Sequence, residues 1–414
     1  MTRFPKDFVW GTATAAHQIE GGNVNSDFWL AENVPETIFR EPSGDACDSY
    51  HRYGEDIALA AELGFNTHRF GIEWARIEPE PGVFSRAALD HYLRVLDCCH
   101  AHGLAPMVSL NHWTVPRWFA ARGGFEREDS PDLFARFADQ VGRHLGDGMA
   151  YVTTFNEANI QRVIGSTFHN PKAAPGLAAM KQACARACGS DRFSMVQFAT
   201  SDEIEAQLVE SHHRAVQALR AGPGNFELGV TISMAEVEGV GEDNQAEAFE
   251  NDLYGPWLEV AKTADFVGVQ TYTRYRIGPE GRLRLPPDAV RTDMGYEYRP
   301  EALEATVRFA ARRIGRPIIV TEHGIASSDD TRRVALIDTA LEGLERCLAD
   351  GIDLRGYVHW SLLDNFEWVL GYGMRFGLVE VDRTTFARTA KPSARHLGKI
   401  ARLSRDHNVD AMKG

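Results

Sequence analysis

Eight short apolar runs rich in β-forming residues recur along the chain, and segments with helical periodicity separate them. The runs are FVWGTATA (8–15), THRFGIEW (67–74), APMVSLNHW (105–113), YVTTFNE (151–157), FELGVTISM (226–234), DFVGVQTY (265–272), PIIVTEHG (317–324) and GYVHWSLL (356–363). Clear helical patterns occupy 86–103, 131–146, 203–222 and 331–351. Strands that alternate with helices indicate a parallel sheet. Eight such units predict a closed (β/α)₈, or TIM, barrel of the α/β class.

The rival architecture is an open, doubly wound sheet. No GxGxxG motif follows the first run, which weakens this alternative. Although 414 residues would suit two or three domains, α/β barrels often reach this length as one. We therefore expect a single catalytic domain over residues 1–414, with an irregular loop region at 165–202 on the face of the barrel that carries the site and a frayed tail at 403–414.

The formal net charge of −14 argues against a nucleic acid or an anionic membrane as partner, because both attract basic surfaces. No apolar run reaches the roughly 18 residues of a membrane span, and no signal peptide opens the sequence. These features predict a cytoplasmic protein.

The six cysteines favour buried free thiols over disulfides or a metal site. Cys98 and Cys99 are adjacent within one helical pattern, and Cys184 and Cys188 have no histidine pair at ligand spacing. His212 and His213 lie in another helical pattern, for which a solvated face is the simplest interpretation. We expect no metal and no organic cofactor.

Polar and aromatic residues stand where seven of the eight runs stop, and the run that ends near Met234 is the exception. The active site of such a barrel lies at the carboxyl ends of its strands. The residues at these ends are His17, Gln18 and Glu20; Glu73 and Trp74; His112 and Trp113; Asn156 and Glu157; Gln270 and Tyr272; Glu322 and His323; His359, Trp360 and Ser361.

Two carboxylates, Glu157 and Glu322, end the fourth and seventh runs and would face each other across the barrel mouth. Paired carboxylates that flank a glycosidic bond are the working groups of most glycoside hydrolases. Arg69 could keep Glu322 ionised, and an apolar wall could raise the pKa of Glu157. The flat faces of Trp113, Trp360, Trp368 and Phe376 could pack against the C–H face of a sugar.

Four motifs, in this order, resemble glycoside hydrolase family 1, the β-glucosidase family. FVWGTATAAHQIEGG (8–22) resembles its N-terminal signature, TFNEA (154–158) its acid/base motif and TEHG (321–324) its nucleophile motif. GYVHWSLLDNFEWVLGYGMRFGLVEVD (356–382) is nearly the family's C-terminal pattern. The resemblance covers about residues 4–400.

The resemblance implies a role for each matching residue. Glu157 would be the general acid/base and Glu322 the nucleophile of a retaining, double-displacement hydrolysis. Asn156 would bind the sugar 2-hydroxyl, Trp360 would form the floor of the sugar pocket and Trp368 would add an indole hydrogen bond. The other implied contacts are Gln18, His112 and Glu367 with the 3-, 4- and 6-hydroxyls, and Arg69 and Tyr272 with Glu322.

Two details narrow the expected substrate. Glu157 stands where the family's thioglucosidase branch has an amide, which favours an O-glycosidase. Glu367 and Trp368 stand where the phospho-sugar branch has small and cationic groups, and a carboxylate would repel a 6-phosphate. The sequence therefore predicts an unphosphorylated sugar.

Several positions depart from the family pattern. Ala158 stands where the family usually has Pro, His323 where it has Asn, Thr114 where it has Asp, and Gln270-Thr271 where it has Asn-Tyr. We expect these differences at the rim of the pocket, where they would affect the choice of aglycone.

The expected activity is that of a retaining β-glycosidase, in the first place a β-glucosidase acting on short β-linked oligosaccharides or small aryl and alkyl β-glucosides. β-Galactosidase, β-fucosidase or transglycosidase activity in the same site are alternatives. A catalytically inactive sugar-binding barrel is the alternative of a different class. The presence of both carboxylates, Glu157 and Glu322, argues against it. The only expected partner is a small carbohydrate.

Overall fold

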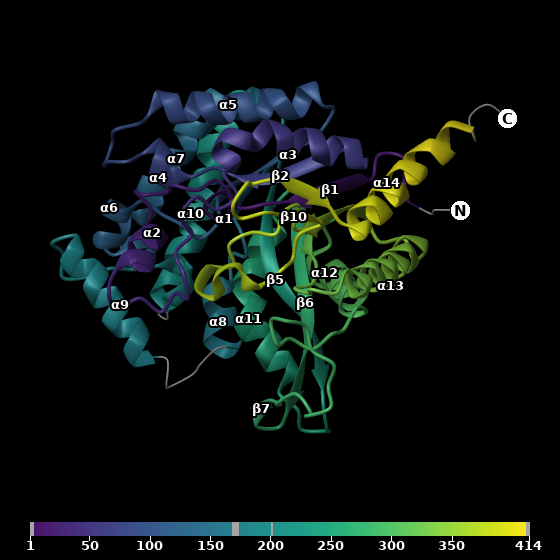
Figure 1. Cartoon of the computed structure of the whole chain (residues 1–414). Helices are drawn as coiled ribbons and strands as arrows, with labels where there is room; N and C mark the ends of the chain where they lie inside the picture. Colours follow the sequence, from purple (N-terminus) through teal and green to yellow (C-terminus); the bar gives the residue numbers. More distant parts are fainter. Residues whose placement is uncertain (1–3, 168–173, 200–201, 411–414) are drawn as a thin grey trace.

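A computed structural model describes residues 4–167, 174–199 and 202–410. Its centre is a closed barrel of eight parallel strands, surrounded by helices (Figure 1). All eight predicted strands are confirmed. They are β1 (Val9–Ala13), β2 (Thr67–Gly71), β3 (Ala105–Asn111), β4 (Tyr151–Phe155), β5 (Glu227–Gly239), β6 (Phe266–Gly278), β8 (Ile318–His323) and β9 (Leu354–Trp360).

The strands follow the chain around the barrel, in the order expected for repeated β/α units. The first strand, β1, pairs with both β2 and β9, and the β5–β6 ladder joins the two halves of the sheet. Every pairing within the barrel is parallel. All carboxyl ends therefore open on one face.

A helix follows each barrel strand and returns the chain along the outside. The predicted helical segments agree with the structure to within two residues, and Gly103 and Gly351 take positive φ values just beyond two helix ends. The outer helices are α3 (Ser49–Leu63), α5 (Arg86–Ala101), α7 (Ser130–Leu145), α10 (Asp202–Ala221), α11 (Ala246–Ala261), α12 (Ala302–Ile314), α13 (Asp330–Ala349) and α14 (Pro392–Asp410).

Shorter elements lie in the loops between strands and outer helices. They are α1 (Ala16–Ile19), α2 (Asp27–Asn33), α4 (Trp74–Ile77), α6 (Arg117–Ala121), η1 (Gly124–Glu126), η2 (Gly146–Gly148), α8 (Ile160–Thr167), α9 (Ala174–Ala187), η3 (Val196–Phe198), β7 (Gly281–Arg282), η4 (Trp368–Gly373), β10 (Val379–Val381) and β11 (Arg388–Ala390).

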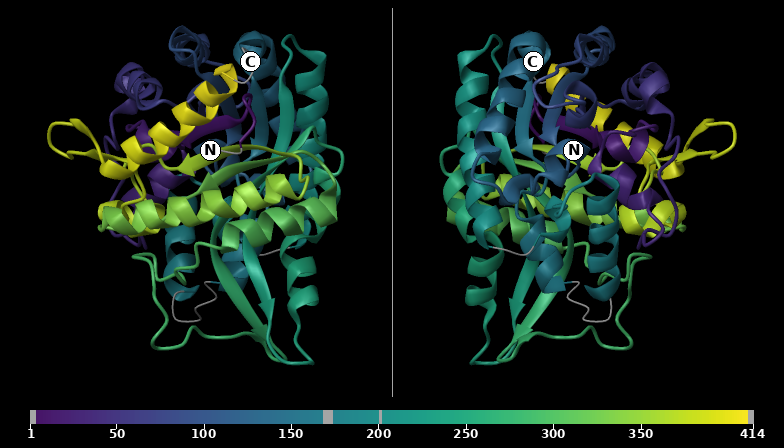
Figure 2. Two further views of the ribbon diagram at one scale, coloured as in Figure 1. Left: turned by 90° about the vertical axis from the view of Figure 1, so that its right-hand side faces the viewer. Right: turned by 90° about the vertical axis from the view of Figure 1, so that its left-hand side faces the viewer.

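Strands β5 and β6 are longer than the sequence predicted. Their parallel ladder continues to the pair Gly239 and Ile277, and β7 turns back against the end of β6. Figure 2 shows this two-stranded ribbon projecting past the ring of helices. The predicted runs stop at 234 and 272 because charged residues interrupt the apolar ones beyond these positions. On β6, Arg274 and Arg276 are partly exposed and alternate with the buried Tyr275 and Ile277, as in a strand with one covered face.

The expected irregular region at 165–202 is wrong over residues 174–187, which α9 occupies. Its glycine, proline and alanine content suggested a loop. However, Pro175 lies in the first helical turn, where the missing N–H costs nothing, and alanine is a strong helix former. Residues 168–173 and 200–201 of this prediction lie outside the described part of the chain.

The expected frayed tail from 403 is also wrong as far as residue 410, since α14 continues to Asp410. The partly exposed Ile400 and the buried Ala401 attach this helix to the core. Residues 411–414 lie outside the described range.

A compact cluster of side chains fills the barrel below its open face. It joins Val9, Met107, Phe266, Ile319 and Val358 from five strands and reaches up to Trp360. This filling closes the barrel interior below the face on which the carboxyl ends of the strands open.

The cysteines are free thiols, four of them buried, as predicted. Across residues 4–167, 174–199 and 202–410, no helix combines the length and apolar character needed to cross a membrane.

Candidate active site

Glu322, in β8, accepts hydrogen bonds on both carboxylate oxygens. Arg69 Nη1, from β2, lies 2.5 Å from Oε1, and the Tyr272 hydroxyl, from β6, donates to Oε2 at 2.6 Å. All three side chains point into the barrel mouth, and Glu322 is only 3% exposed. Burial raises the pKa of Glu322, while the Arg69 charge and the Tyr272 hydroxyl oppose this rise. The two donors, Arg69 and Tyr272, favour the ionised carboxylate against the effect of burial.

Glu157 follows β4 directly and is equally enclosed. Its backbone N–H donates to Thr231 Oγ1 at 3.0 Å and to Gln270 Oε1 at 3.2 Å, and Ser233 hydrogen-bonds to its carboxyl group. Burial, followed by the negative charge of Glu322, raises the pKa of Glu157 to about 8. Two carboxyl groups at one mouth thus have environments that drive their proton affinities apart.

Three non-glycine residues of the site have backbone angles in the left-handed region: Trp113 (φ 73°), Glu157 (φ 43°) and Trp368 (φ 50°). Such conformations cost about 1–3 kcal/mol each and persist only where surrounding contacts hold them. At Trp113 the holding contacts run through Asn111, whose Oδ1 accepts from Trp113 N at 3.0 Å and whose Nδ2 donates to Thr114 O at 2.8 Å.

Asn156 connects several groups of the site. Its Oδ1 accepts from Arg69 Nη2 at 2.6 Å and from Gln270 Nε2 at 2.7 Å. Its Nδ2 lies 3.0 Å from His112 Nε2. Burial and the nearby Arg69 lower the pKa of His112 well below its usual value, so this imidazole is neutral and its Nε2 can accept.

Gln18 and Glu367 lie beside each other at the barrel mouth. Gln18 Nε2 lies 3.4 Å from Glu367 Oε2 and donates to Phe366 O at 2.7 Å. Gln18 Oε1 is buried and has no hydrogen-bond partner among the described residues. Burial, and then the charge of Glu322, raise the pKa of Glu367 to about 8. A buried acceptor without a partner needs a ligand hydroxyl or a water molecule.

Aromatic rings line the mouth between these polar groups. His112 stacks near Trp360 with ring centroids 5.5 Å apart, and Trp113 lies 4.7 Å from Trp368. Trp113 Nε1 is buried and has no partner within the described residues. Phe376 packs edge-on against Tyr272 at 5.9 Å. Flat apolar faces beside hydrogen-bonding groups are suited to a sugar, which has both kinds of surface.

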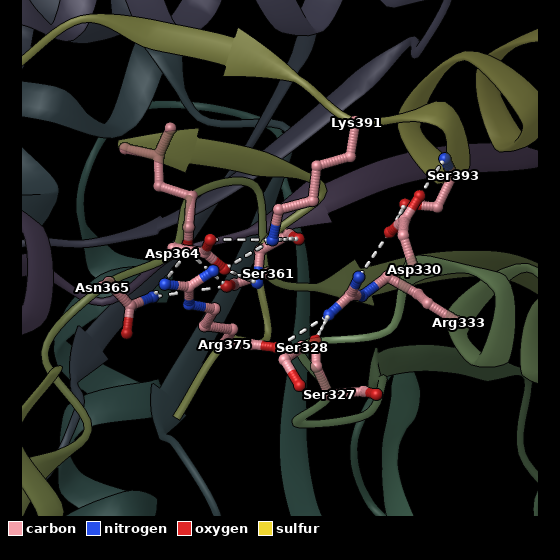
Figure 3. Close-up of polar contacts among 12 residues, drawn as sticks. Ser327, Ser328, Asp330, Arg333, Ser361, Asp364, Asn365, Arg375, Lys391 and Ser393 are labelled. Carbon is pink, nitrogen blue, oxygen red and sulfur yellow. Dashed lines mark hydrogen bonds and ion pairs between the residues drawn. The ribbon is translucent and has the colours of Figure 1, made fainter. Parts of the chain in front are cut away.

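The loop that carries Glu367, Trp368 and Phe376 is fastened at its base by buried cations (Figure 3). Lys391 Nζ lies 2.7 Å from the Asp364 carboxylate and donates to Gly377 O at 2.7 Å, while Gly377 N donates back to Asp364 at 2.8 Å. Asp364 and Gly377, at the two ends of the loop, are thus hydrogen-bonded to each other and to Lys391.

Arg333, in α13, joins the same loop to the segment that follows β8. Its Nη2 donates to Ser327 O at 2.8 Å and to Arg375 O at 2.7 Å. Asp330 pairs with this guanidinium and accepts from Ser393 Oγ at 2.7 Å. The Glu322 strand and the Glu367 loop therefore share one buried polar support.

The site residues predicted from the sequence lie in barrel strands or in the loops that follow the carboxyl ends of these strands. Trp74 is a buried core residue, like Trp10. Both ring nitrogens of His17 form hydrogen bonds within the protein, one with Glu32 and one with Asn23. His17 therefore has a supporting role in the site. Glu73 is buried and accepts from Thr114 Oγ1 at 2.8 Å.

Two expectations about the site region are wrong. The fifth strand does contribute, through Thr231 and Ser233, both of which contact Glu157. Their two-residue spacing within an apolar run is the signal that could have revealed them. His212 is buried rather than solvated, because its Nδ1 lies 2.7 Å from Thr154 Oγ1; only His213 is exposed.

The described residues contain no group of three or more His, Cys, Asp or Glu side chains arranged to hold a metal ion. The chemistry that this mouth offers is acid/base and nucleophilic.

Comparison with known proteins matches the sequence to the model of glycosyl hydrolase family 1 over residues 1–257 and 257–405. The chain belongs to glycosyl hydrolase family 1. It is therefore a glycoside hydrolase, as its motifs and its paired carboxylates predicted.

Relatives of this family 1 enzyme include β-glucosidase A of Acetivibrio thermocellus, which is 30% identical over 94% of this chain and 96% of its own. The thermostable β-glucosidase B of Thermobispora bispora is 32% identical over 94% of this chain and 89% of its own. Among solved structures, a β-glucosidase designated 1317 has a TM-score of 0.92 and 49% identity, covering 96% of this chain and 98% of its own.

The structure of Thermotoga maritima β-glucosidase in complex with glucoimidazole is also similar. It has a TM-score of 0.82 and 25% identity, covering 97% of this chain and 99% of its own. The (β/α)₈ barrel of the family 1 enzyme is thus shared along the whole length of relatives that are named β-glucosidases.

Proposed function

We propose that this family 1 enzyme is a retaining β-glucosidase that hydrolyses unphosphorylated β-linked oligosaccharides or small aryl and alkyl β-glucosides. One observation carries the proposal: the same mouth holds Glu322, bonded to Arg69 and Tyr272, and Glu157, whose pKa is raised to about 8. The first suits a nucleophile and the second an acid that is still protonated at neutral pH.

In the first step, a Glu322 oxygen forms a bond to the anomeric carbon while the bond to the leaving oxygen breaks. Glu157 gives its proton to that oxygen, so the aglycone leaves as a neutral alcohol. As Glu322 loses negative charge to the new bond, the negative field that raised the proton affinity of Glu157 weakens. Glu157 then becomes a stronger acid at the moment its proton is needed.

In the second step, water attacks the glycosyl–Glu322 ester from the vacated side. Glu157, now ionised, takes the water proton, and the ester bond to Glu322 breaks. The sugar is released with its original anomeric configuration, and both carboxyl groups return to their starting states. Arg69 and Tyr272 stabilise the charge that reappears on Glu322.

The sugar would occupy the ring of polar groups around these carboxylates. Asn156, beside Glu157, is placed for the 2-hydroxyl, and the Trp360 ring offers a floor. The remaining proposed hydroxyl contacts are Gln18, His112, Glu367 and Trp368. Support comes from the unpartnered Gln18 Oε1 and from the relative named as a complex with glucoimidazole.

The test is hydrolysis of 4-nitrophenyl β-glucoside, β-galactoside and β-fucoside, with the anomer of the released sugar read by NMR. The proposal expects the glucoside to be preferred and the β-anomer to be released first. Glu322→Ala should lose hydrolysis and regain rate with azide, forming an α-glycosyl azide. Glu157→Gln should retain glycosylation only with leaving groups as good as dinitrophenolate.

Other outcomes would identify the alternatives. A higher rate with the galactoside or fucoside would reassign the sugar, and disaccharide products in the presence of acceptors would indicate transglycosylation. Tight glucose binding without turnover of any β-glycoside would mean a sugar-binding barrel and would overturn the proposal.

A further inference from the structure

We propose that Gln270 is a positioning residue for this reaction: its single amide fixes the orientation of Asn156 and holds the carboxylate of Glu322. The sequence predicts Gln270 at the rim of the pocket, where it would affect the choice of aglycone, whereas the structure buries this side chain completely beside Asn156. The inference rests on the proposed roles of Glu157 and Glu322 and goes beyond them.

An irregularity in the sheet brings Gln270 beside Glu322. Along the β6–β8 ladder, Val269 pairs with Val320, but the next pair is Gln270 with Glu322, so β8 contains one extra residue, Thr321. Bulges of this kind re-aim side chains next to active sites. Gln270 and Tyr272, two residues apart on β6, both face the mouth and both contact Glu322.

Every hydrogen-bonding end of the Gln270 amide is occupied, and the side chain is fully buried. Its Oε1 accepts from Glu157 N at 3.2 Å. Its Nε2 donates to Asn156 Oδ1 at 2.7 Å and also to the carboxylate of Glu322. One side chain therefore bonds to both segments that carry the proposed catalytic groups.

The contact with Asn156 decides which way round its amide lies. Both Gln270 Nε2 and Arg69 Nη2 are donors, so they require an oxygen at their common contact point. The Asn156 Nδ2 is then directed to the other side, toward His112 Nε2. The group that Asn156 turns to the sugar pocket is consequently a donor, which is the partner a 2-hydroxyl oxygen needs.

The contact with Glu322 adds a third donor to a carboxylate that other charges also influence. Arg69 and Tyr272 bond to Glu322 directly, while Glu157 and Glu367 lie near enough to interact with its charge. A donated hydrogen bond favours the ionised form. Removing the Gln270 amide should therefore make Glu322 easier to protonate.

Gln270→Met is a suitable variant because it keeps the length of the side chain and removes both hydrogen-bonding ends. Thr231 Oγ1 still accepts from Glu157 N, and Arg69 still donates to Asn156 Oδ1, so no backbone group loses its last partner. Gln270→Asn, which keeps the amide but is one methylene shorter, is the second variant. Thr271→Val is the matched control, since Thr271 points outward to Thr306 from the next position of the same strand.

The experiment measures kcat/KM against pH for 4-nitrophenyl β-glucoside and its 2-deoxy analogue. For Gln270→Met we expect kcat/KM of the glucoside to fall about 10- to 100-fold, with a smaller loss for the 2-deoxyglucoside. The acid limb of the profile should move up by ~0.5–1 pH unit. Gln270→Asn should fall between wild type and Gln270→Met, and Thr271→Val should leave the limb in place.

A ¹³C-carboxyl NMR titration of Glu322, identified by its absence in Glu322→Gln, provides a readout that needs no substrate. An upward shift in Gln270→Met or Gln270→Asn supports the inference. If both the Glu322 titration and the 2-hydroxyl discrimination match wild type in whichever of the two variants folds, the inference is overturned. A wild type that hydrolyses no β-glycoside would contradict the proposed function, while the titration would still decide the role of Gln270.

Discussion

Arg69 and Glu322 form an ion pair at 2.5 Å, and the arginine side chain is fully buried. The same guanidinium donates to Asn156 at 2.6 Å. One cation thus connects β2 to the ends of β4 and β8 across the barrel mouth. From this position Arg69 stabilises the negative charge of Glu322 and fixes the orientation of the Asn156 amide.

Replacing Arg69 by Met should destabilise the protein in a pH-dependent way. At pH 7 the variant leaves the Glu322 carboxylate buried without its cation, and we expect a loss of about 3 kcal/mol in the free energy of unfolding. Below pH 4.5 both proteins hold a protonated Glu322, so the difference should narrow. Urea denaturation at pH 7 and pH 4 checks this, and an equal loss at both values would contradict it.

Glu157 should make the enzyme less stable at alkaline pH, because its pKa rises from 4.5 to about 8 on folding. The folded protein holds a proton that the unfolded chain releases, so this contribution to stability is complete below pH 4.5 and lost as pH rises through 8. Glu157→Gln imitates the protonated form. It should be more stable than wild type by at least ~1 kcal/mol at pH 9, with no gain at pH 4.

Thermal unfolding across pH 4–9 measures this difference. A constant offset between Glu157→Gln and wild type at every pH would show that the substitution acts through packing, and the alkaline cost would then lie in other groups.

Glu367→Gln should separate sugars by their 6-position. Glu367 is proposed to contact the hydroxymethyl end of glucose, so its loss should lower kcat/KM for the glucoside about 10-fold or more. A β-xyloside, which lacks the hydroxymethyl group, should suffer less. Glu380→Gln, an exposed carboxylate on β10, is the control and should leave both rates as in wild type. Equal losses for the two sugars in Glu367→Gln would rule out the proposed contact.

Lys391→Met should weaken both the fold and the pocket. Asp364 would remain half-buried without its cation, and we expect a loss of about 2–4 kcal/mol in unfolding free energy. KM for the glucoside should rise, because the loop that carries Glu367 and Trp368 loses its fastening. The exposed Lys399, eight residues further along in α14, offers a matched control as Lys399→Met. Adding Asp364→Asn to Lys391→Met should recover part of the stability; no recovery would argue against the pair.

The barrel and most of its site follow from local signals in the sequence. Apolar runs with polar ends mark buried parallel strands that stop at a solvated mouth, and this placed Glu157, Glu322 and Trp360 on one face. The apolar pattern does not mark two elements, the far ends of β5 and β6 and the helix α9. In the ribbon of β5 and β6, charged residues beyond 234 and 272 interrupt the apolar runs, although Tyr275 and Ile277 alternate with arginines and are buried. Helix α9 combines helix-breaking and helix-forming residues, so its sequence suggested a loop.

The contacts of Gln270 could not be predicted for a different reason. They depend on an extra residue in β8 that shifts the pairing from Val320 to Glu322. Register between parallel strands is decided by packing across the barrel, which no local pattern records. Lys391 and Asp364 are likewise far apart in the chain, and only the folded loop brings them together.

The contact between Lys391 and the base of the Glu367 loop determines when this loop can form during synthesis of the chain. Lys391 lies just ahead of α14, and β9 is the strand that closes the barrel onto β1. A chain emerging from the ribosome therefore cannot fasten the Glu367 loop until Lys391 has been made. A truncation ahead of Lys391 would remove this fastening while leaving Glu157 and Glu322 in the sequence.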